Sequence, residues 1–193
     1  MILLARHGET DDNVPPLRFQ GQRDTPLNDT GRAQARELAE RVAAHDPPIA
    51  AIWASDLSRA RETAEIVGAR LALPVRLDAR LREGWRGEWE GFLFDEIAAS
   101  DPQRYAAWRN PDAEIGFRFP GGESLAEQQA RVLTCLGEIA VVGPPSPGAV
   151  LVVCHGGSIR TVLCRDDPRG LAAFHDFEVP NVALVPVKAA ALR

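Results

Sequence analysis

Basic side chains follow each of three short apolar runs in this sequence. They are Arg6 and His7 after residues 2–5, Arg59 after residues 49–54, and His155 after residues 149–153. Apolar runs of this length are typical of buried strands. Because ligands of open α/β sheets bind beyond the carboxyl ends of the strands, we expect these four side chains to converge at one sheet edge.

Such a cluster has the chemistry of a phosphate site. Two arginines can neutralise and orient non-bridging phosphate oxygens with paired hydrogen bonds. Gly156 and Gly157 follow the third run and offer backbone N–H groups at the start of a helix. A histidine has an unperturbed pKa of about 6.5, so it can act as a neutral nucleophile or as a charged donor. Covalent catalysis by histidine would divide hydrolysis into phosphoryl transfer to the ring and transfer on to water.

The leaving alkoxide of this reaction needs a proton from a carboxyl group. Glu83, at the start of a Trp- and Gly-rich stretch, is the candidate, and Glu9, Glu88 and Glu90 are weaker ones. The sequence has no Gly-x-x-x-x-Gly-Lys-Ser/Thr loop and no paired Asp cluster that would require magnesium. We therefore expect side chains to compensate the phosphate charge, with no metal.

Six motifs occur in order between residue 1 and about residue 160. They are Arg6-His7-Gly8-Glu9-Thr10 with Asn13, Phe19-Gln20-Gly21-Gln22 with Asp24, Ser55-Asp56-Leu57-Ser58-Arg59-Ala60, Leu81 and Glu83 with Trp89-Glu90-Gly91, Pro120-Gly121-Gly122-Glu123-Ser124, and His155-Gly156-Gly157. Each motif alone is weak, but the ordered set is specific. The chain resembles the histidine phosphatase superfamily, in its phosphoglycerate mutase-like branch.

The resemblance implies site residues and a fold. It implies that His7 is the phosphorylated nucleophile, Glu83 the proton donor and later the base for water, and His155 a stabiliser of the transferring group. The phosphate-binding residues that it implies are Arg6, Asn13 and Arg59, with Gln22 and the backbone of Gly156 as lesser contacts. It also implies an α/β/α sandwich and no metal or other cofactor.

Two departures from the family bear on the reaction. Cys154 stands where the family commonly has Ser, which would make the site sensitive to oxidation if the thiol were exposed. True mutases generally carry a longer insertion with extra basic residues than the segment between Glu83 and Ser124 here. We therefore favour a metal-independent phosphomonoesterase for a small phosphorylated metabolite. The alternatives are a cofactor-dependent phosphoglycerate mutase and a catalytically weak phosphate-ligand binding protein.

The composition indicates one domain over residues 1–193. The net charge is −5 and basic residues are interspersed with acidic ones, so we expect neither a nucleic-acid partner nor a membrane partner. The N-terminus lacks the features of a signal peptide, and the three cysteines lack metal-ligand spacing. These features favour the cytoplasm. The oligomeric state is left open, a homodimer included.

The pattern along the chain is that of an α/β protein with a mostly parallel central sheet. Apolar runs predict strands at 2–5, 49–54, 75–77, 149–153 and 182–187, and helical periodicity predicts helices over 31–45, from about 57 to 71, over 125–141 and over 159–164. Residues 11–30 are predicted to form a functional loop. A cap is expected at about 84–124, with Trp85, Trp108, Arg104, Arg109 and Arg118 as candidates for substrate selection.

Overall fold

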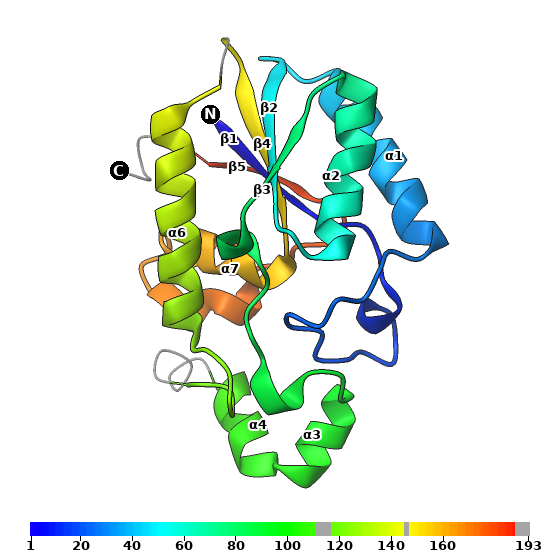
Figure 1. The fold of residues 1–193 in the computed structure, drawn as a ribbon. Helices are drawn as coiled ribbons and strands as arrows, with labels where there is room; N and C mark the ends of the chain where they lie inside the picture. Colours follow the sequence, from blue (N-terminus) through cyan, green and yellow to red (C-terminus); the bar gives the residue numbers. More distant parts are fainter. Residues whose placement is uncertain (111–116, 145–146, 188–193) are drawn as a thin grey trace.

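A five-stranded sheet forms the centre of the protein (Figure 1). The computed structural model describes residues 1–110, 117–144 and 147–187. Its strands are β1 (Ile2–Arg6), β2 (Ile49–Ala54), β3 (Val75–Leu77), β4 (Ala149–Cys154) and β5 (Leu184–Val187). Their order is β3-β2-β4-β1-β5, and only β5 is antiparallel to its neighbour. The predicted α/β fold with a mostly parallel sheet is therefore confirmed.

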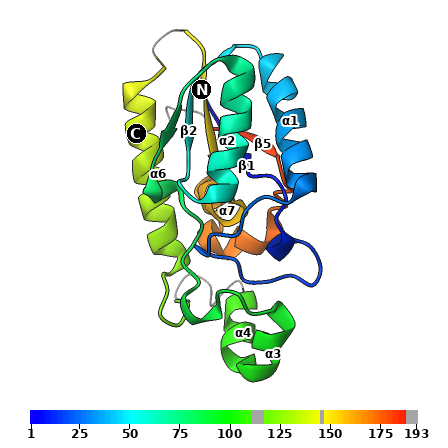
Figure 2. The ribbon, with the colours of Figure 1, turned by 45° about the vertical axis from the view of Figure 1, so that its right-hand side comes forward.

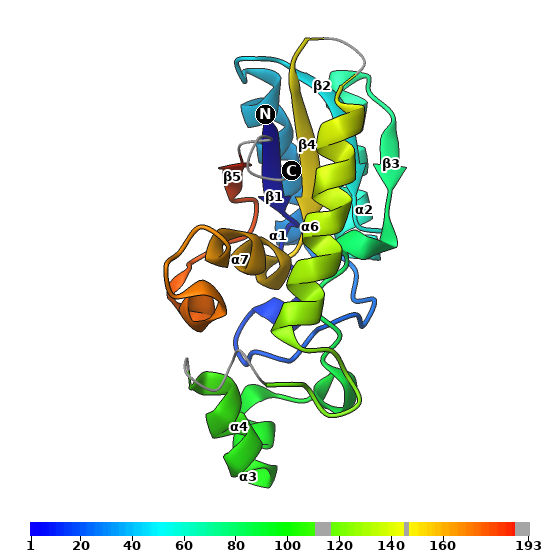
Figure 3. The ribbon, with the colours of Figure 1, turned by 90° about the vertical axis from the view of Figure 1, so that its left-hand side faces the viewer.

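Helices cover both faces of the sheet. Helices α1 (Asp29–Ala43) and α2 (Ser58–Leu71) lie on one face, and α6 (Leu125–Val142) and α7 (Gly156–Cys164) on the other (Figures 1 and 3). Alternate residues of β1 point to opposite faces, as the pleat of a strand requires. Ile2 and Leu4 pack with α6 and α7, whereas Leu3 and Ala5 pack with α1 and α2. Three layers result, as the family resemblance implied.

The starts of two helices, α1 and α7, differ from the sequence-based prediction. Helix α1 begins at Asp29, because the side chain of Asn28 accepts a hydrogen bond from the Gly31 amide at 2.8 Å. Helix α7 begins at Gly156, three residues before its predicted start.

Ser55 and Asp56 precede α2, and the polar side chains of this pair would suit a helix cap, but neither caps the helix. The first turn of that helix is capped from the preceding loop instead, since Asp24 accepts a hydrogen bond from the Ser58 amide at 2.7 Å.

A cap lies beyond the carboxyl ends of the strands (Figure 2). Its helices are α3 (Phe94–Ser100) and α4 (Pro102–Arg109), and residues 111–116 of the predicted cap lie outside the described residues. Phe19 from the loop packs against Trp89 and Trp108 of the cap segment. The loop at 11–30 is thereby joined to the cap, and both are held over the ends of the strands.

Short 3-10 helices occur in the connections. They are Asp11–Asn13, Ala79–Leu81, Gly87–Trp89 and Gly170–Asp176. The first of them lies within the segment predicted as a loop, and the last predicted strand begins at Leu184, two residues later than expected. No helix in the described part of the chain is long and apolar enough to cross a membrane.

Candidate active site

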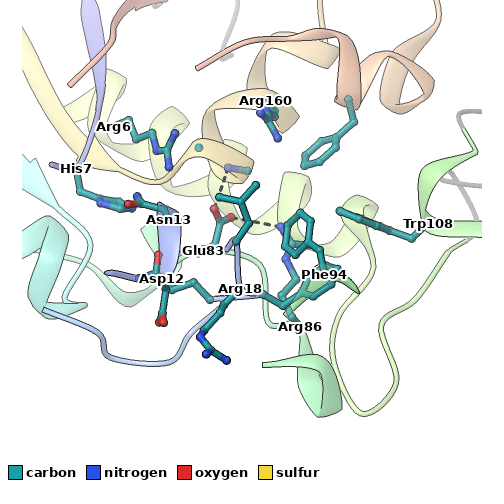
Figure 4. A pocket seen from close by; sticks show the side chains of 16 residues that line it. Arg6, His7, Asp12, Asn13, Arg18, Glu83, Arg86, Phe94, Trp108 and Arg160 are labelled. Atoms are coloured by element: carbon teal, nitrogen blue, oxygen red, sulfur yellow. Dashed lines mark hydrogen bonds and ion pairs between the residues drawn. The ribbon is translucent and has the colours of Figure 1, made fainter. Parts of the chain in front are cut away.

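A pocket of about 290 Å³ opens at the carboxyl ends of the strands, between the sandwich and the cap (Figure 4). Five predicted site residues line it. They are Arg6, His7, Asn13, Glu83 and Gly156. Strand β1 supplies the first two and α7 begins at Gly156, so the sheet brings together residues that lie far apart in the sequence. His155 and Arg59 are fully buried beside the pocket and do not line it.

His7 is buried and neutral. Its Nδ1 lies 2.6 Å from the backbone oxygen of Gly8, and because a carbonyl only accepts, Nδ1 carries the proton. Burial is the main cause that lowers the pKa of His7 well below 6.5, and Arg59, His155 and Arg6 lower it further. Nε2 therefore keeps its lone pair, so the ring needs no deprotonation before it can attack an electrophile.

Four buried polar atoms around His7 have no hydrogen-bond partner. They are Arg6 Nε, Asn13 Nδ2, Arg59 Nε and His155 Nδ1. The other guanidinium nitrogens of Arg59 donate to the backbone oxygens of Arg23 and Gly21, at 2.8 and 2.7 Å, which fixes the direction of Nε. A buried donor without a partner costs about 1–3 kcal/mol. A phosphate has the acceptor oxygens that this cluster lacks.

Ser55 forms a hydrogen bond with the ring of His155. The His155 Nε2 lies 2.9 Å from Ser55 Oγ, which already accepts a hydrogen bond from the Leu57 amide at 3.3 Å. When the hydroxyl donates its proton to Nε2, the proton of the ring lies on Nδ1. The two imidazole rings are 5.1 Å apart, so His155 can donate to an oxygen of a phosphoryl group on His7.

Glu83 is ionised in this structure. Its Oε1 accepts hydrogen bonds from the Gly84 amide and from Gln128, both at 2.8 Å, and its Oε2 accepts one from the Gly157 amide at 2.8 Å. Burial alone would raise the pKa of Glu83, but Arg86 and these hydrogen bonds outweigh it and lower the pKa to about 2. A Cβ at Gly157 would lie 2.3 Å from Glu83 Oε1, so a larger residue here would displace the carboxylate.

We expect the free energy of unfolding to decrease as the pH falls below about 6.5. His7 and His155 are neutral when folded, because burial above all lowers the pKa of each well below 6.5. Unfolding returns the pKa of both histidines to about 6.5, so below that pH the unfolded chain binds more protons than the folded one. The free energy of unfolding then decreases by up to about 1.4 kcal/mol per pH unit for each histidine.

Urea unfolding at about pH 7.5 and about pH 5.5 measures this decrease. The two histidines contribute to the decrease in the free energy of unfolding between these pH values, and His7→Asn should remove about half of that contribution. A decrease of the same size in this variant and in the wild type would contradict the neutral state of His7.

Three other carboxylates and Gln22 lie outside the pocket. The side-chain amide of Gln22 donates a hydrogen bond to the backbone oxygen of Glu83 at 3.2 Å, and Gln22 does not line the pocket. It therefore joins the loop at 11–30 to the backbone of Glu83. Glu9 accepts a hydrogen bond from Asn28, Glu88 is exposed, and Glu90 accepts hydrogen bonds from backbone amides.

Most of the expected substrate-selecting side chains do not reach the pocket. Trp108 lines it, whereas Trp85 is half-exposed at the surface. Arg104 pairs with Asp101, Arg118 with Glu127, and Arg109 lies 3.3 Å from a ring nitrogen of His175. Cys154 is buried, and burial above all raises the pKa of its thiol to about 12, so it is not a reactive thiol.

Sequence reasoning missed several lining residues. They are Asp12, Leu17, Arg18, Phe19, Gln20, Arg86, Phe94, Arg160 and Phe174. A signal existed for Arg160, which follows Gly156 by four residues on a helix and therefore shares its face. No such signal exists for Phe174, since it lies beyond the last of the six motifs, which ends at Gly157. Among the described residues, no three His, Cys, Asp or Glu side chains gather as metal ligands.

Comparison with known proteins agrees with this geometry. Residues 2–191 match the family described as the histidine phosphatase superfamily (branch 1). The chain belongs to this superfamily. The sequence-based assignment is thus confirmed, and the protein is a phosphatase-type enzyme of the histidine phosphatase superfamily.

Relatives in the superfamily differ in reaction. The chain is 39% identical over 167 residues to glucosyl-3-phosphoglycerate phosphatase of Mycobacterium tuberculosis, covering 83% of this chain and 72% of that protein. It is 37% identical over 164 residues to a probable phosphoglycerate mutase of Erwinia tasmaniensis, covering 84% of this chain and 72% of that protein. The structure of a mycobacterial glucosyl-3-phosphoglycerate phosphatase with inorganic phosphate is similar, with a TM-score of 0.78 and 33% identity over 94% of this chain and 86% of that one.

Proposed function

We propose that this histidine phosphatase is a metal-independent phosphomonoesterase that hydrolyses a small phosphorylated metabolite through a phosphohistidine on His7. The observation that carries the proposal is the lone pair of His7 Nε2 beside four buried polar atoms without partners. An ester phosphoryl group would satisfy Arg6, Asn13, Arg59 and His155 while its phosphorus faces His7. The donors are fixed before substrate arrives, so little reorganisation is needed in the transition state.

In the first step, Nε2 of His7 forms a bond to phosphorus as the bond from phosphorus to the ester oxygen breaks. The leaving oxygen takes a proton from Glu83. Arg6, Arg59 and His155 stabilise the charge on the three non-bridging oxygens. The Nδ1 proton of His7 stays on its hydrogen bond to Gly8, which stabilises the positive charge that develops on the ring.

In the second step, water attacks phosphorus and the bond to His7 breaks. Glu83, now ionised, accepts the proton of the attacking water, and inorganic phosphate is released. The Glu83 carboxylate is held at both oxygens by the amides of Gly84 and Gly157 and by Gln128, so it keeps its place through both steps.

The cap favours hydrolysis over the mutase reaction. Its segment at 84–124 contains four arginines and no lysine. Of these arginines, only Arg86 lines the pocket, and the guanidinium groups of Arg104 and Arg118 pair with carboxylates elsewhere. The segment thus lacks the several pocket-facing cations that would retain a released acid for re-phosphorylation. Cys135, Cys154 and Cys164 are buried as reduced thiols, which supports a cytoplasmic location.

Phosphate release in the presence of a chelator tests this proposal. The substrates are an aryl phosphate and a panel of alkyl monoesters, among them phosphoglycerates. Chelator-resistant release of inorganic phosphate is the expected result. Isomerised phosphoglycerate without release would favour the mutase, and binding without either product would favour a phosphate-ligand binding protein.

A further inference from the structure

Arg131 of α6 forms hydrogen bonds to the main chain that carries Glu83. Its Nη1 donates to the backbone oxygens of Arg80 and Arg82, at 2.8 and 2.7 Å, and its Nη2 donates to that of Glu83 at 2.9 Å. Its Nε and Nη2 also donate to the carboxylate of Glu123, at 3.0 and 2.5 Å. These five hydrogen bonds use the five N–H groups of a guanidinium, so Arg131 acts on the protein and has no donor left for a substrate.

Glu123 extends this connection to the other side of Glu83. Its Oε1 accepts a hydrogen bond from the Trp85 amide at 2.8 Å, and its own amide donates to the backbone oxygen of Trp85 at 2.9 Å. Arg131 and Glu123 together thus hold the main chain from Arg80 to Trp85. Their side chains are 21% and 14% exposed, so the ion pair is screened by solvent less than a surface pair.

Helix α6 holds the carboxylate of Glu83 as well as its main chain. Gln128 lies three residues before Arg131, on the same face of the helix, and donates to Glu83 Oε1 at 2.8 Å. Leu81, in the held segment, belongs to the same buried core cluster as Val132 of α6. The segment is therefore fixed to one helix by hydrogen bonds and by packing.

We propose that Arg131 is a positioning residue for Glu83, which keeps the carboxylate where it can protonate the leaving oxygen. A general acid must lie within hydrogen-bond reach of that oxygen. Lysine would keep the charge, but its three donors lie on one nitrogen, so it cannot serve three backbone oxygens and a carboxylate together. The inference rests on the proposed phosphatase function and adds a residue to the machinery of Glu83.

Arg131→Lys tests the proposal with two substrates. They are p-nitrophenyl phosphate and the alkyl monoester that the wild type hydrolyses fastest. We expect kcat/KM for the alkyl ester to fall about 10- to 100-fold, the scale of a misplacement of about 1 Å. For p-nitrophenyl phosphate kcat/KM should stay near the wild-type value, because nitrophenolate leaves without a proton. The ratio of the two values is measured within one variant, so a change in the amount of folded protein cancels.

The double variant Arg131→Lys with Glu83→Gln shows whether Arg131 acts through Glu83. The ratio of the alkyl to the aryl kcat/KM should be the same as in Glu83→Gln alone, because no acid remains to be positioned.

Arg70→Lys is the matched control. Arg70 of α2 donates to Glu40 through Nε and Nη2, at 2.7 and 3.1 Å, and lies outside the pocket. This variant loses a similar two-nitrogen contact with a carboxylate and should keep the wild-type ratio. Glu123→Gln provides a second variant if Arg131→Lys does not fold. It leaves Arg131 in place and removes one of the two carboxylate oxygens, so the ratio should fall by a smaller factor.

The failure of this inference differs from that of the phosphatase proposal. Equal losses for both substrates in Arg131→Lys, or a further fall of the ratio in the double variant, would overturn the role of Arg131. Phosphate release by the wild type would still support the phosphatase in that case. If the wild type released no phosphate from any ester, both proposals would be wrong.

Discussion

Replacing His7 with alanine is expected to abolish turnover, with kcat lowered by about 10⁴-fold or more, the scale seen when a catalytic nucleophile is removed. The remaining pocket still has its buried donors, but it has no atom that can take the phosphoryl group. Stopped phosphate-release assays with an aryl phosphate measure the loss. Quenching with alkaline detergent after brief exposure to a labelled ester should trap an acid-labile, alkali-stable phosphoenzyme in the wild type and none in the variant.

His45→Ala is the matched control. His45 is exposed, and its Nδ1 lies 2.7 Å from the backbone oxygen of Pro47, far from the pocket. It should retain full activity and label like the wild type. Activity of His7→Ala above about one hundredth of the wild-type value would show that His7 is not the nucleophile.

Glu83→Gln is expected to separate substrates by leaving group. Glutamine keeps the size of the side chain but has no carboxyl proton to give. We expect kcat/KM for an alkyl phosphate to fall about 10²- to 10⁴-fold, the usual contribution of general acid catalysis. For p-nitrophenyl phosphate the loss should be much smaller, because nitrophenolate leaves without a proton.

The second step gives an independent readout on the same variant. Without the carboxylate as base, hydrolysis of the phosphohistidine should be slow, so the variant should show a burst of nitrophenol followed by slow release. Equal losses of kcat/KM for both substrates would count against Glu83 as the acid. The absence of a burst would count against its role as the base.

The ionised state of Glu83 has a further consequence for pH dependence. With its pKa lowered to about 2, Glu83 has no proton to give in the free enzyme near neutrality. The proton must then arrive with the ester, whose second pKa is about 6. Binding next to Arg6 and Arg59 would move that proton to Glu83. We therefore expect kcat/KM for alkyl esters to fall as pH rises above about 6, which a pH profile measures.

The phosphoryl end of the pocket was predictable from the sequence, and the leaving-group end was not. Arg6, His7 and His155 follow strands, and the carboxyl ends of parallel strands meet by geometry alone. Glu83 was named from its place at the start of the Trp- and Gly-rich stretch, and Asn13 through a family motif. The structure adds how they are held, through Gly8, Ser55 and Gln128.

The leaving-group end depends on tertiary packing that no local pattern specifies. Trp85 and Trp108 look alike in the sequence, yet one is half-exposed and the other lines the pocket. The sequence allowed Arg104 and Arg118 to be cations of the pocket, but in the structure each forms an ion pair with a nearby carboxylate instead. The N-terminal cap of α2 comes from Asp24, 34 residues before Ser58, a pairing that helix-start rules do not consider.

The position of β1 in the sheet also determines when the site can exist during synthesis. β1 pairs with β4 on one side and β5 on the other, and both partners come late in the chain, at residues 149–154 and 184–187. Its apolar residues leave the ribosome long before either partner. They remain an unpaired edge in the nascent chain, exposed to aggregation and to chaperones. A ribosome stalled before β4 would thus hold a chain that carries His7 but has no pocket around it.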